Sequence, residues 1–497
     1  MKKILQVACV AITLCLSIFF AHGCSQDSNL SATKISSKNK YDLYIFSSKG
    51  EISQPFKELC NIYEKERGIR IRLQQIGSGT NHLEPLRIQM SSSEKPSIFS
   101  IQGLRELIEW QYSKTALDFN NSTLESFKNL ANEIPPNFRL TSDGKNNYGI
   151  PYSIEGYGYI ADKQMLCDIF GENNLKDIMR DLKVSSYGEF ENFVESLDFY
   201  IKTGNVRSFE LNGRTYMPQK DKVGLAKNLE AVFSVAGAER WTYCDHMVNI
   251  ALGAVFKSPF ELLNADNTQA DSMKGALKKY AKSLDLKTSH AMVKRGPEFI
   301  NVTSGDYNRA IKDFSDGKTV FIKQGNWIGP NISKLNPDML KRLVVFPVKM
   351  DMSSEDIKRD DMTVDKFNRS IPVYVPNFFA INAKVDIKEQ ELAEEFLVWL
   401  NTSDVARDYI INKFGFIPYN APDDLVLDSS LNNSILEYKR SSDTLAAVYH
   451  GVGENWSKET LGLKIMEDYL TKTDWQENDY NDIACFAIEK FKELKFW

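Results

Sequence analysis

YDLYIF at residues 41–46, IRIRL at residues 69–73 and SIFSI at residues 97–101 are the short apolar segments that decide the fold. Apolar residues recur at helical spacing between them, over residues 52–63 and again over residues 83–90. The strict alternation in the second segment is typical of a half-buried strand. Strand and helix therefore alternate along this stretch, which predicts an α/β fold with a parallel sheet covered by helices.

The loops after these strands are candidates for ligand contact. In parallel sheets, ligands bind beyond the carboxyl ends of the strands. Ser48 and Glu51 follow the first predicted strand, and Gln102 follows the third. We therefore expect these three polar side chains to face a binding cleft.

Residues 148–161 differ from their surroundings because they are rich in glycine and tyrosine. We interpret this extended stretch as a crossing between two lobes, since glycine supplies the backbone angles that a bend needs. Glu155 and Tyr157 are predicted to lie there, at the floor of the cleft. Beyond it, helical spacing over 187–202, 222–236 and 241–254 predicts a second lobe that is largely helical.

A helix, a strand and an aromatic segment follow one another after residue 304. The apolar spacing predicts a helix that ends at Asp316-Gly317, then a strand at residues 319–322. Gly325-Asn326-Trp327 comes directly after that strand. Residues 343–347 and 378–382 are further candidates for buried strands.

The N-terminus has the layout of a secretory signal. Lys2 and Lys3 precede an apolar run at residues 4–20, and small residues then lead to Cys24. We predict that residues 1–23 are removed. The segment that ends at Cys24 resembles a bacterial lipobox, and this resemblance implies that Cys24 is lipidated with palmitate. A plain secretory signal and an uncleaved membrane anchor are the alternatives. Residues 24–40 are rich in Ser, Asn and Lys, which predicts a flexible tether.

The mature chain is too long for a single core, so more than one unit is expected. We assign its lobes as follows: residues 41–150 and about 300–400 to an N-terminal α/β lobe, and residues 151–300 and about 401–497 to a second, helix-rich lobe.

Charge and motif content exclude several classes of protein. The formal net charge is −5 and there is no long basic block, so the sequence does not favour a nucleic-acid partner. The histidines lack the spacing of metal ligands, and we predict no metal site and no cofactor. The sequence also lacks HExxH and GxSxG, two motifs typical of hydrolases.

Several motifs of the chain resemble those of the extracellular solute-binding proteins of ABC importers, in the group that serves oligosaccharide uptake. They are Phe314-x-x-Gly317-Lys318-Thr319-Val320-Phe321 with Gly325-Asn326-Trp327, Phe379-Ala380-Ile381-Asn382-Ala383-Lys384, Gly415-Phe416-Ile417-Pro418, and Tyr148-Gly149-Ile150-Pro151-Tyr152. The segment ending at Cys24 also resembles a lipobox. The resemblance covers about residues 41–420.

This resemblance implies a two-lobe fold of the periplasmic-binding-protein kind, with a hinge that lets the lobes close on ligand. It implies a monomer without enzymatic activity, anchored outside the cytoplasm by its N-terminal lipid. Such a protein would capture a carbohydrate, most simply an oligosaccharide, and deliver it to the permease subunits of a transporter.

Carbohydrate chemistry selects the remaining site candidates. The C–H faces of sugars pack on aromatic rings, and their hydroxyls need amide or carboxylate partners. Trp327 with Asn326 and Trp241 meet the first requirement, and Asn377 precedes a strand near the same cleft. The full set of predicted ligand contacts is Trp327, Asn326, Trp241, Glu155, Tyr157, Gln102, Ser48, Glu51 and Asn377.

Three other functions stay open at the level of sequence. The same fold could bind a peptide, an anion or a metal chelate, and Lys49 and Lys323 keep the anion open. The protein could present its ligand to a membrane sensor instead of a permease. An exported carbohydrate-active enzyme with two carboxylates across a cleft is the third alternative.

Overall fold

A computed structural model describes residues 41–77 and 81–494. The predicted signal at residues 1–23, the lipidation site Cys24 and the tether at residues 24–40 lie outside the described residues. Among the helices of the described ranges, none combines the length and the apolar character needed to cross a membrane.

Five strands form the sheet of the first lobe, in the order β2-β1-β3-β12-β4. β1 pairs in parallel with β2 and β3, which confirms the parallel start predicted from the sequence. β12 runs antiparallel to both of its neighbours. All of β1 is buried, as expected for a strand with helices over both faces. The bounds are β1 (Leu43–Ser47), β2 (Ile71–Gln75), β3 (Ile98–Ile101), β4 (Ile150–Pro151) and β12 (Phe378–Ile381).

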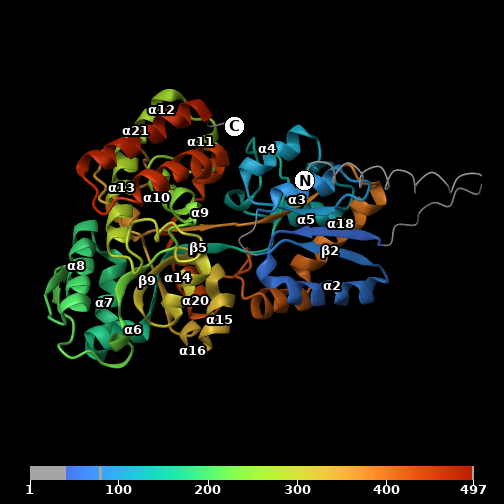
Figure 1. Ribbon diagram of the computed structural model, residues 1–497. Helices are drawn as coiled ribbons and strands as arrows, with labels where there is room; N and C mark the ends of the chain where they lie inside the picture. The colour runs from blue at the N-terminus through green and yellow to red at the C-terminus, as the bar shows by residue number, and fades with distance from the viewer. Residues whose placement is uncertain (1–40, 78–80, 495–497) are drawn as a thin grey trace, which may run out of the picture. The chain divides into compact units, whose positions relative to one another are not determined.

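The helices of the first lobe present the apolar stripes that the sequence spacing predicts. α2 buries Phe56, Leu59 and Tyr63, and it ends at Gly68, whose φ of +67° is the left-handed conformation that closes many helices. In Figure 1, α2 lies on one side of the sheet and α3 on the other. The bounds are α2 (Ser53–Arg67), α3 (Leu83–Ser91), α4 (Leu104–Tyr112), α5 (Glu125–Glu133), α18 (Ile387–Thr402) and α19 (Asp404–Asp408).

The second lobe also contains a sheet, in the order β13-β11-β5-β9-β8, with β10 as an additional partner of β5. All of β5 is buried, and it runs antiparallel to β9, β10 and β11. The bounds are β5 (Glu155–Asp162), β8 (Ala231–Ser234), β9 (Thr319–Gly325), β10 (Leu343–Phe346), β11 (Ile371–Tyr374) and β13 (Thr444–Leu445), beside a separate hairpin of β6 (Phe209–Leu211) and β7 (Arg214–Tyr216).

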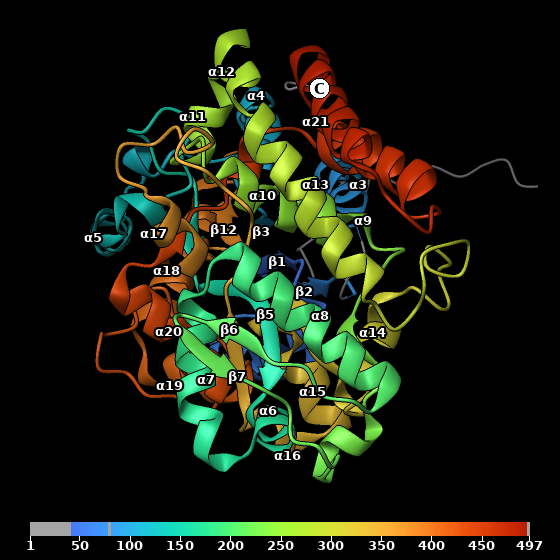
Figure 2. The ribbon, with the colours of Figure 1, turned by 90° about the vertical axis from the view of Figure 1, so that its left-hand side faces the viewer.

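Helices surround this second sheet, as the sequence predicts for a helix-rich lobe. Figure 1 shows α9, α10 and α13 on one side of β5 and α14, α15 and α20 on the other. α13 packs along α21, and Figure 2 shows these two helices next to each other. The bounds are α6 (Lys163–Phe170), α7 (Glu172–Val184), α8 (Tyr187–Thr203), α9 (Arg240–Cys244), α10 (His246–Leu252), α11 (Pro259–Leu263), α12 (Asn267–Ser272), α13 (Lys274–Ser289), α14 (Tyr307–Ser315), α15 (Gly329–Leu335), α16 (Pro337–Leu340), α17 (Val364–Arg369), α20 (Ser430–Ser441) and α21 (Glu477–Leu494).

The sheet pairing corrects part of the lobe assignment. β9, β10 and β11 belong to the second sheet, although the sequence analysis placed residues from about 300 to 400 in the first lobe. Only β12 and α18 of that segment join the first sheet. Conversely, Phe414 packs against Phe56 of α2, in the first lobe, although the prediction assigns residues from about 401 onwards to the second lobe. Strand pairing is a long-range choice, so a local apolar pattern identifies a strand without identifying its partner.

One predicted helix is wrong and another is divided. Residues 222–236 contain a short 3-10 helix at Gly224–Asn228 and then the buried strand β8. A short apolar run such as AVFS does not distinguish a buried strand from a helix by its period. The predicted helix at 241–254 is present as α9 and α10, which are separated at Asp245.

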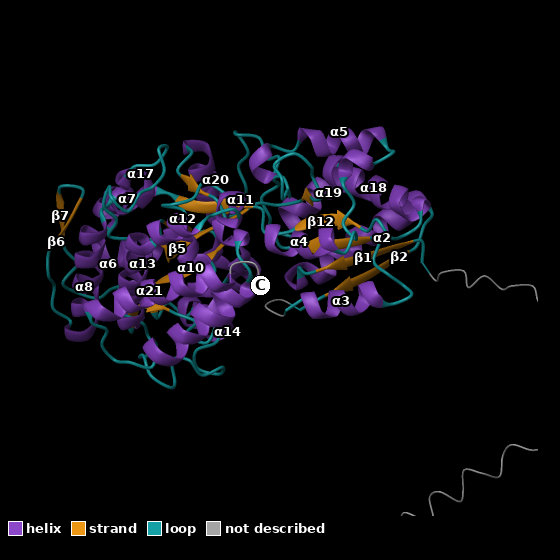
Figure 3. Ribbon diagram, turned by 90° about the horizontal axis from the view of Figure 1, so that it is seen from above, coloured by secondary structure: helices purple, strands orange, loops and turns teal. Residues whose placement is uncertain are grey.

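The chain crosses between the lobes at two neighbouring connections between strands, and again between α19 and α20. Figure 3 shows the sheets from above. β4 of the first sheet leads into β5 of the second through residues 152–154, within the predicted crossing at 148–161. β11 returns to β12 through residues 375–377. Both connections end beside the cleft described next.

Candidate functional site

A cleft of about 630 Å³ is lined by residues from both lobes. The first lobe contributes the loops after β1 and β3, as predicted from the parallel sheet. The second lobe contributes α9, α10 and the 3-10 helices η5 (Asn326–Ile328) and η7 (Val448–Gly451). The lining residues are Ser48, Lys49, Glu51, Asn81, His82, Leu83, Gln102, Arg105, Glu155, Ala238, Glu239, Arg240, Trp241, Asp245, His246, Tyr307, Asn308, Trp327, Asn331, Tyr374, Pro376, Asn377, Tyr449, His450, Glu454, Lys458 and Glu459.

Aromatic side chains form one wall of the cleft. The ring centroids of Trp241 and Trp327 are 6.4 Å apart, and the His246 ring lies 5.1 Å from the first and 5.0 Å from the second. The rings of Tyr374 and Tyr449 also contact His246, at 6.4 Å and 5.8 Å between centroids. We call Trp241, His246, Trp327, Tyr374 and Tyr449 the aromatic wall.

Hydrogen bonds fix the orientation of both indoles. Trp327 Nε1 donates to Gln324 Oε1 at 3.0 Å, and Trp241 Nε1 donates to Glu239 Oε2 at 3.0 Å. Gly325 lets the Trp327 ring fold back over its own backbone, because a Cβ at this position would lie 2.2 Å from the ring. With both N–H groups bound to protein acceptors, each indole offers a ligand its ring surface.

A buried ion pair lies at the floor of the cleft. Lys49 Nζ lies 2.6 Å from Glu155 Oε1 and 3.3 Å from Glu51 Oε1. Burial alone would lower the pKa of Lys49, but the carboxylates of Glu155 and Glu51 outweigh burial and raise it. The Lys49 ammonium therefore stays charged and is neutralised by the protein itself.

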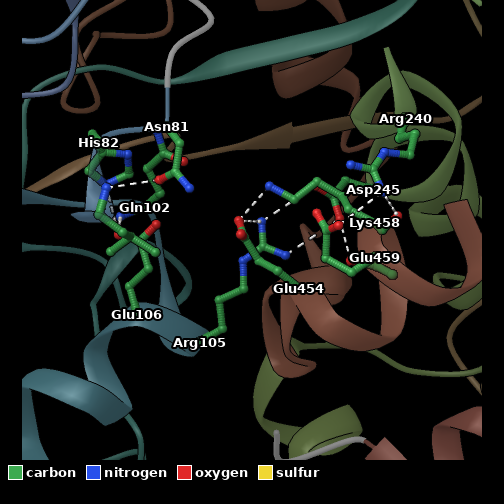
Figure 4. Close-up of polar contacts among 12 residues, drawn as sticks. Asn81, His82, Gln102, Arg105, Glu106, Arg240, Asp245, Glu454, Lys458 and Glu459 are labelled. Atoms are coloured by element: carbon green, nitrogen blue, oxygen red, sulfur yellow. Dashed lines mark hydrogen bonds and ion pairs between the residues drawn. The ribbon is translucent and has the colours of Figure 1, made fainter. Parts of the chain in front are cut away.

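A second ion network connects the two lobes (Figure 4). Arg105 of α4 reaches both carboxylate oxygens of Asp245, which separates α9 from α10, at 3.4 Å. Its guanidinium also lies 3.4 Å from Glu454 and 5.3 Å from the ring of Tyr449. Burial would raise the pKa of Asp245, but Arg105 and Lys458 bring it down to about 2. Asp245 is therefore an anion throughout the physiological range.

Every cationic side chain that lines the cleft in the described structure has a carboxylate partner. Besides Lys49 and Arg105, Lys458 lies 2.5 Å from Glu454 and Arg240 lies 3.0 Å from Glu459. His246 and His450 are neutral, because burial lowers the pKa of both rings. The cleft thus presents no unpaired positive charge to a ligand.

Amide and hydroxyl groups cover the wall formed by the first lobe. Ser48 Oγ donates to Asn377 Oδ1 at 2.7 Å, which leaves the amide nitrogen of Asn377 beside the cleft. Asn81 accepts from the backbone N–H of Leu83 through its Oδ1. Gln102 lines the cleft next to Glu106, which accepts from the Gln102 N–H at 2.7 Å. Planar amides of this kind match the donor and acceptor pattern of hydroxyl groups.

The structure brings seven of the predicted contacts together in this cleft: Trp327, Trp241, Glu155, Gln102, Ser48, Glu51 and Asn377. Asn326 and Tyr157 lie behind the cleft surface and do not line it. Asn326 accepts from the Gly156 N–H and donates to Asn432, and the Tyr157 hydroxyl donates to the carbonyl of His246. Both are positioning residues, because their polar atoms are bound within the protein.

Sequence reasoning missed several cleft residues. His246 directly follows the Trp241–Asp245 segment and could have been included with Trp241. Arg105, Tyr449 and His450 carry no local signal, because they reach the cleft only through contacts between distant segments. His450, for example, packs so closely on the backbone of Gly103 that a Cβ at that position would lie 1.9 Å from the His450 ring.

The cleft offers no sign of a metal centre. Among the described residues, no group of three or more His, Cys, Asp or Glu side chains is arranged to hold a metal ion. Five of the cleft carboxylates are engaged in the ion pairs given above, and Glu239 accepts from the Trp241 N–H.

Several solved structures share this fold. RafE in complex with raffinose aligns with a TM-score of 0.62 at 16% identity, covering 91% of this chain and 99% of that one. A Streptococcus pneumoniae solute-binding protein in complex with the blood group A-trisaccharide has a TM-score of 0.58 at 14% identity, covering 91% and 100%. The GacH receptor of Streptomyces glaucescens has a TM-score of 0.59 at 12% identity, covering 91% and 98%.

The sequence comparison gives the family. No curated protein matches the chain in sequence. The family of bacterial extracellular solute-binding proteins matches residues 58–423, which is well over half of the chain. The protein therefore belongs to the family of bacterial extracellular solute-binding proteins.

Proposed function

We propose that this protein captures an uncharged carbohydrate, an oligosaccharide, in the cleft between its lobes and delivers it to the permease of an ABC importer. The observation that carries the proposal is the aromatic wall, in which both indole N–H groups are bound by protein acceptors and the ring surfaces remain for ligand. Such surfaces pack against the C–H faces of sugar rings. The amides opposite supply partners for hydroxyl groups.

Electrostatics favours an uncharged ligand over an anion. An anionic ligand needs a cation that is not already neutralised, and each cation lining the described cleft has a carboxylate within 3.4 Å. A metal chelate or acidic peptide meets the same obstacle. An uncharged sugar requires no change in these pairs.

The cleft volume and the structural relatives support the same ligand class. Pockets for small ligands usually measure about 300–1,000 Å³, and this cleft measures about 630 Å³. Two proteins of the same fold were solved with raffinose and with the blood group A-trisaccharide. The site gives no support to the alternative of a carbohydrate-active enzyme, and release of reducing ends from a polysaccharide would establish that alternative.

A thermal-shift panel tests the proposal. The purified protein is heated with mono- and oligosaccharides, and with amino acids, peptides and inorganic anions as controls. A ligand at about 100 times its dissociation constant adds about 2.7 kcal/mol to stability, which raises the midpoint by a few degrees. We expect a shift confined to one family of oligosaccharides. A shift with a peptide or an anion, and none with any sugar, would contradict the proposal.

The location of the protein is part of the proposal. We infer that residues 1–23 are a signal, and that lipid on Cys24 and the tether at residues 24–40 hold the domain, as a monomer, at the outer face of the membrane. Labelled palmitate should be incorporated by the wild type and not by Cys24→Ala. Labelling of both proteins, or of neither, would contradict lipidation at Cys24. Delivery to a sensor is the alternative to import, and loss of sugar uptake on deletion of the gene distinguishes the two.

A further inference from the structure

A small cavity lies next to the aromatic wall and shares no lining residue with the ligand cleft. Its volume is about 10 Å³, which is room for a single water molecule or an ion of similar size. Two of its lining residues support the wall: Gln324 holds the Trp327 N–H, and Thr242 follows Trp241 in the chain. The lining residues are Ser234, Val235, Ala236, Thr242, Lys287, Ile322, Lys323 and Gln324.

Two buried lysines face this cavity. Lys287 of α13 is 2% exposed, and Lys323 of β9 is 5% exposed. Lys323 Nζ donates to the carbonyl of Thr242 at 2.9 Å and lies 4.8 Å from the centre of the Tyr157 ring. Among the described residues, the ammonium of Lys287 has no hydrogen-bond partner within range. Burial, followed by repulsion from Lys287, lowers the pKa of Lys323.

The described protein supplies no negative charge to these lysines at the cavity. None of the eight lining side chains is acidic. The carboxylate that acts on Lys323 is Asp245, and its oxygens are bound by Arg105 and by Ser457. A buried ammonium without a counter-charge is strongly unfavourable, so the pair requires either an anion or the loss of its protons.

Hydrogen bonds to the rest of the protein decide what the polar groups around the cavity can offer an occupant. The hydroxyl groups of Ser234 and Thr242 donate to the carbonyls of Ala310 and Glu239. Gln324 Oε1 accepts from Trp327, so the amide nitrogen of Gln324 remains as a donor. An occupant of the cavity is therefore offered this amide and the two lysine side chains as donors, while the hydroxyl oxygens of Ser234 and Thr242 can only accept.

We propose that this cavity binds one small monovalent anion of halide type, held between the ammonium groups of Lys287 and Lys323. Its volume excludes phosphate, sulfate and carboxylate groups, which have several heavy atoms. The anion balances one of the two positive charges and accepts hydrogen bonds from both side chains, which stabilises the second lobe next to the aromatic wall. The cavity shares no lining residue with the ligand cleft, so a test of the anion site does not depend on the carbohydrate proposal.

Bromide provides a direct probe of the site. Crystals of the purified protein soaked in sodium bromide should give an anomalous peak in the cavity, between the nitrogens of Lys287 and Lys323. The wild type is sufficient for this measurement, so it does not depend on whether a variant folds. Bromide peaks confined to the surface, with water in the cavity, would overturn the proposal and show two neutral amines around a water molecule.

Stability in solution provides the second test. At one ionic strength, thermal midpoints are compared in sodium chloride, sodium bromide and sodium gluconate, whose anion does not fit the cavity. The wild type should be more stable in both halides than in gluconate, and Lys287→Met should lose that difference. Lys349→Met is the matched control, because Lys349 is also buried but donates to the carbonyls of Lys183 and Asn368. Equal midpoints in all three salts, or a halide effect that survives in Lys287→Met, would contradict the site.

Discussion

We propose that ligand capture depends most on the side chain of Trp327. Its ring packs against Tyr157 and His246 and is held by Gln324, so its position is set before ligand arrives. A ring that is already fixed loses little conformational entropy on binding.

Replacing Trp327 by alanine should weaken binding of the sugar found in the thermal-shift panel. Loss of one aromatic contact costs about 1–3 kcal/mol, and calorimetric titration measures the change directly. Trp475→Phe is the control, because Trp475 donates to the carbonyl of Tyr469 and lies away from the cleft. Equal affinities of Trp327→Ala and the wild type would remove this ring from the site.

Lys287 predicts an unusual dependence of stability on pH. Burial lowers the pKa of Lys287 to about 7, against 10.5 for an ordinary lysine, and Cys244 opposes this effect only in part. Between these values the unfolded chain binds the proton and the folded chain does not, so unfolding free energy rises with pH. In gluconate buffer from about pH 7 to pH 8.5, this rise should be steeper in the wild type than in Lys287→Met. Equal slopes of unfolding free energy against pH in the two proteins would contradict the prediction. In chloride, the slope of the wild type should be smaller than in gluconate.

The sequence predicts the cleft side chains that directly follow strands of the parallel sheet. It does not predict those that distant segments of the chain bring to the cleft. Ser48, Glu51 and Gln102 line the cleft because the ends of parallel strands meet at one edge. Asn326 and Tyr157 sit in the predicted segments, but their side chains turn into the protein to satisfy buried backbone groups. Arg105 and Tyr449 reach the cleft through tertiary contacts that local patterns do not encode.

Among the elements, α4 of the first lobe and the α9–α10 segment of the second are joined by Arg105. The Arg105–Asp245 pair is buried and is backed by Glu454 and Tyr449. Because Asp245 lies between Trp241 and His246, the pair also ties the aromatic wall to the first lobe.

Arg105→Gln should shift the unliganded protein towards a more open form and weaken ligand binding. Removing one partner of a buried ion pair commonly costs about 3–5 kcal/mol, and the cost here falls on contact between the lobes. Small-angle scattering should report a larger radius of gyration for the variant. Arg240→Gln is the control, because Arg240 pairs with Glu459 within the second lobe. Equal radii of Arg105→Gln and the wild type would exclude a role for this pair in holding the lobes together.

The sequence predicts most helices and strands, but it does not predict which strands pair with one another. β1 and β3 follow from short apolar runs, β2 follows from its alternation, and α8 follows from its apolar spacing. In the structure, Ser186 and Glu189 form a capping box at the start of α8. β8 was mistaken for a helix because its apolar run is too short to show a period. The sequence predicts β9 and β10 as strands and does not predict β11. Only the folded chain shows that all three pair with β5.

For the whole molecule, two lobes and a cleft between them imply capture by closure. A ligand that contacts both lobes stabilises the closed form by the difference between its affinities for the two forms. Scattering curves of the purified protein should therefore show a smaller radius of gyration with saturating sugar than without it. An unchanged radius with a ligand of proven affinity would contradict closure and leave the binding site intact.

Calorimetric titration tests directly whether the cleft binds a carbohydrate. The purified protein is titrated with the oligosaccharide found in the thermal-shift panel, and the titration is repeated with Trp327→Ala and Trp475→Phe. We predict one site per chain in the wild type, the same affinity in Trp475→Phe and a weaker affinity in Trp327→Ala. Saturable binding of a peptide or an anion, with no heat from any sugar, would contradict the central claim that the cleft is a carbohydrate site.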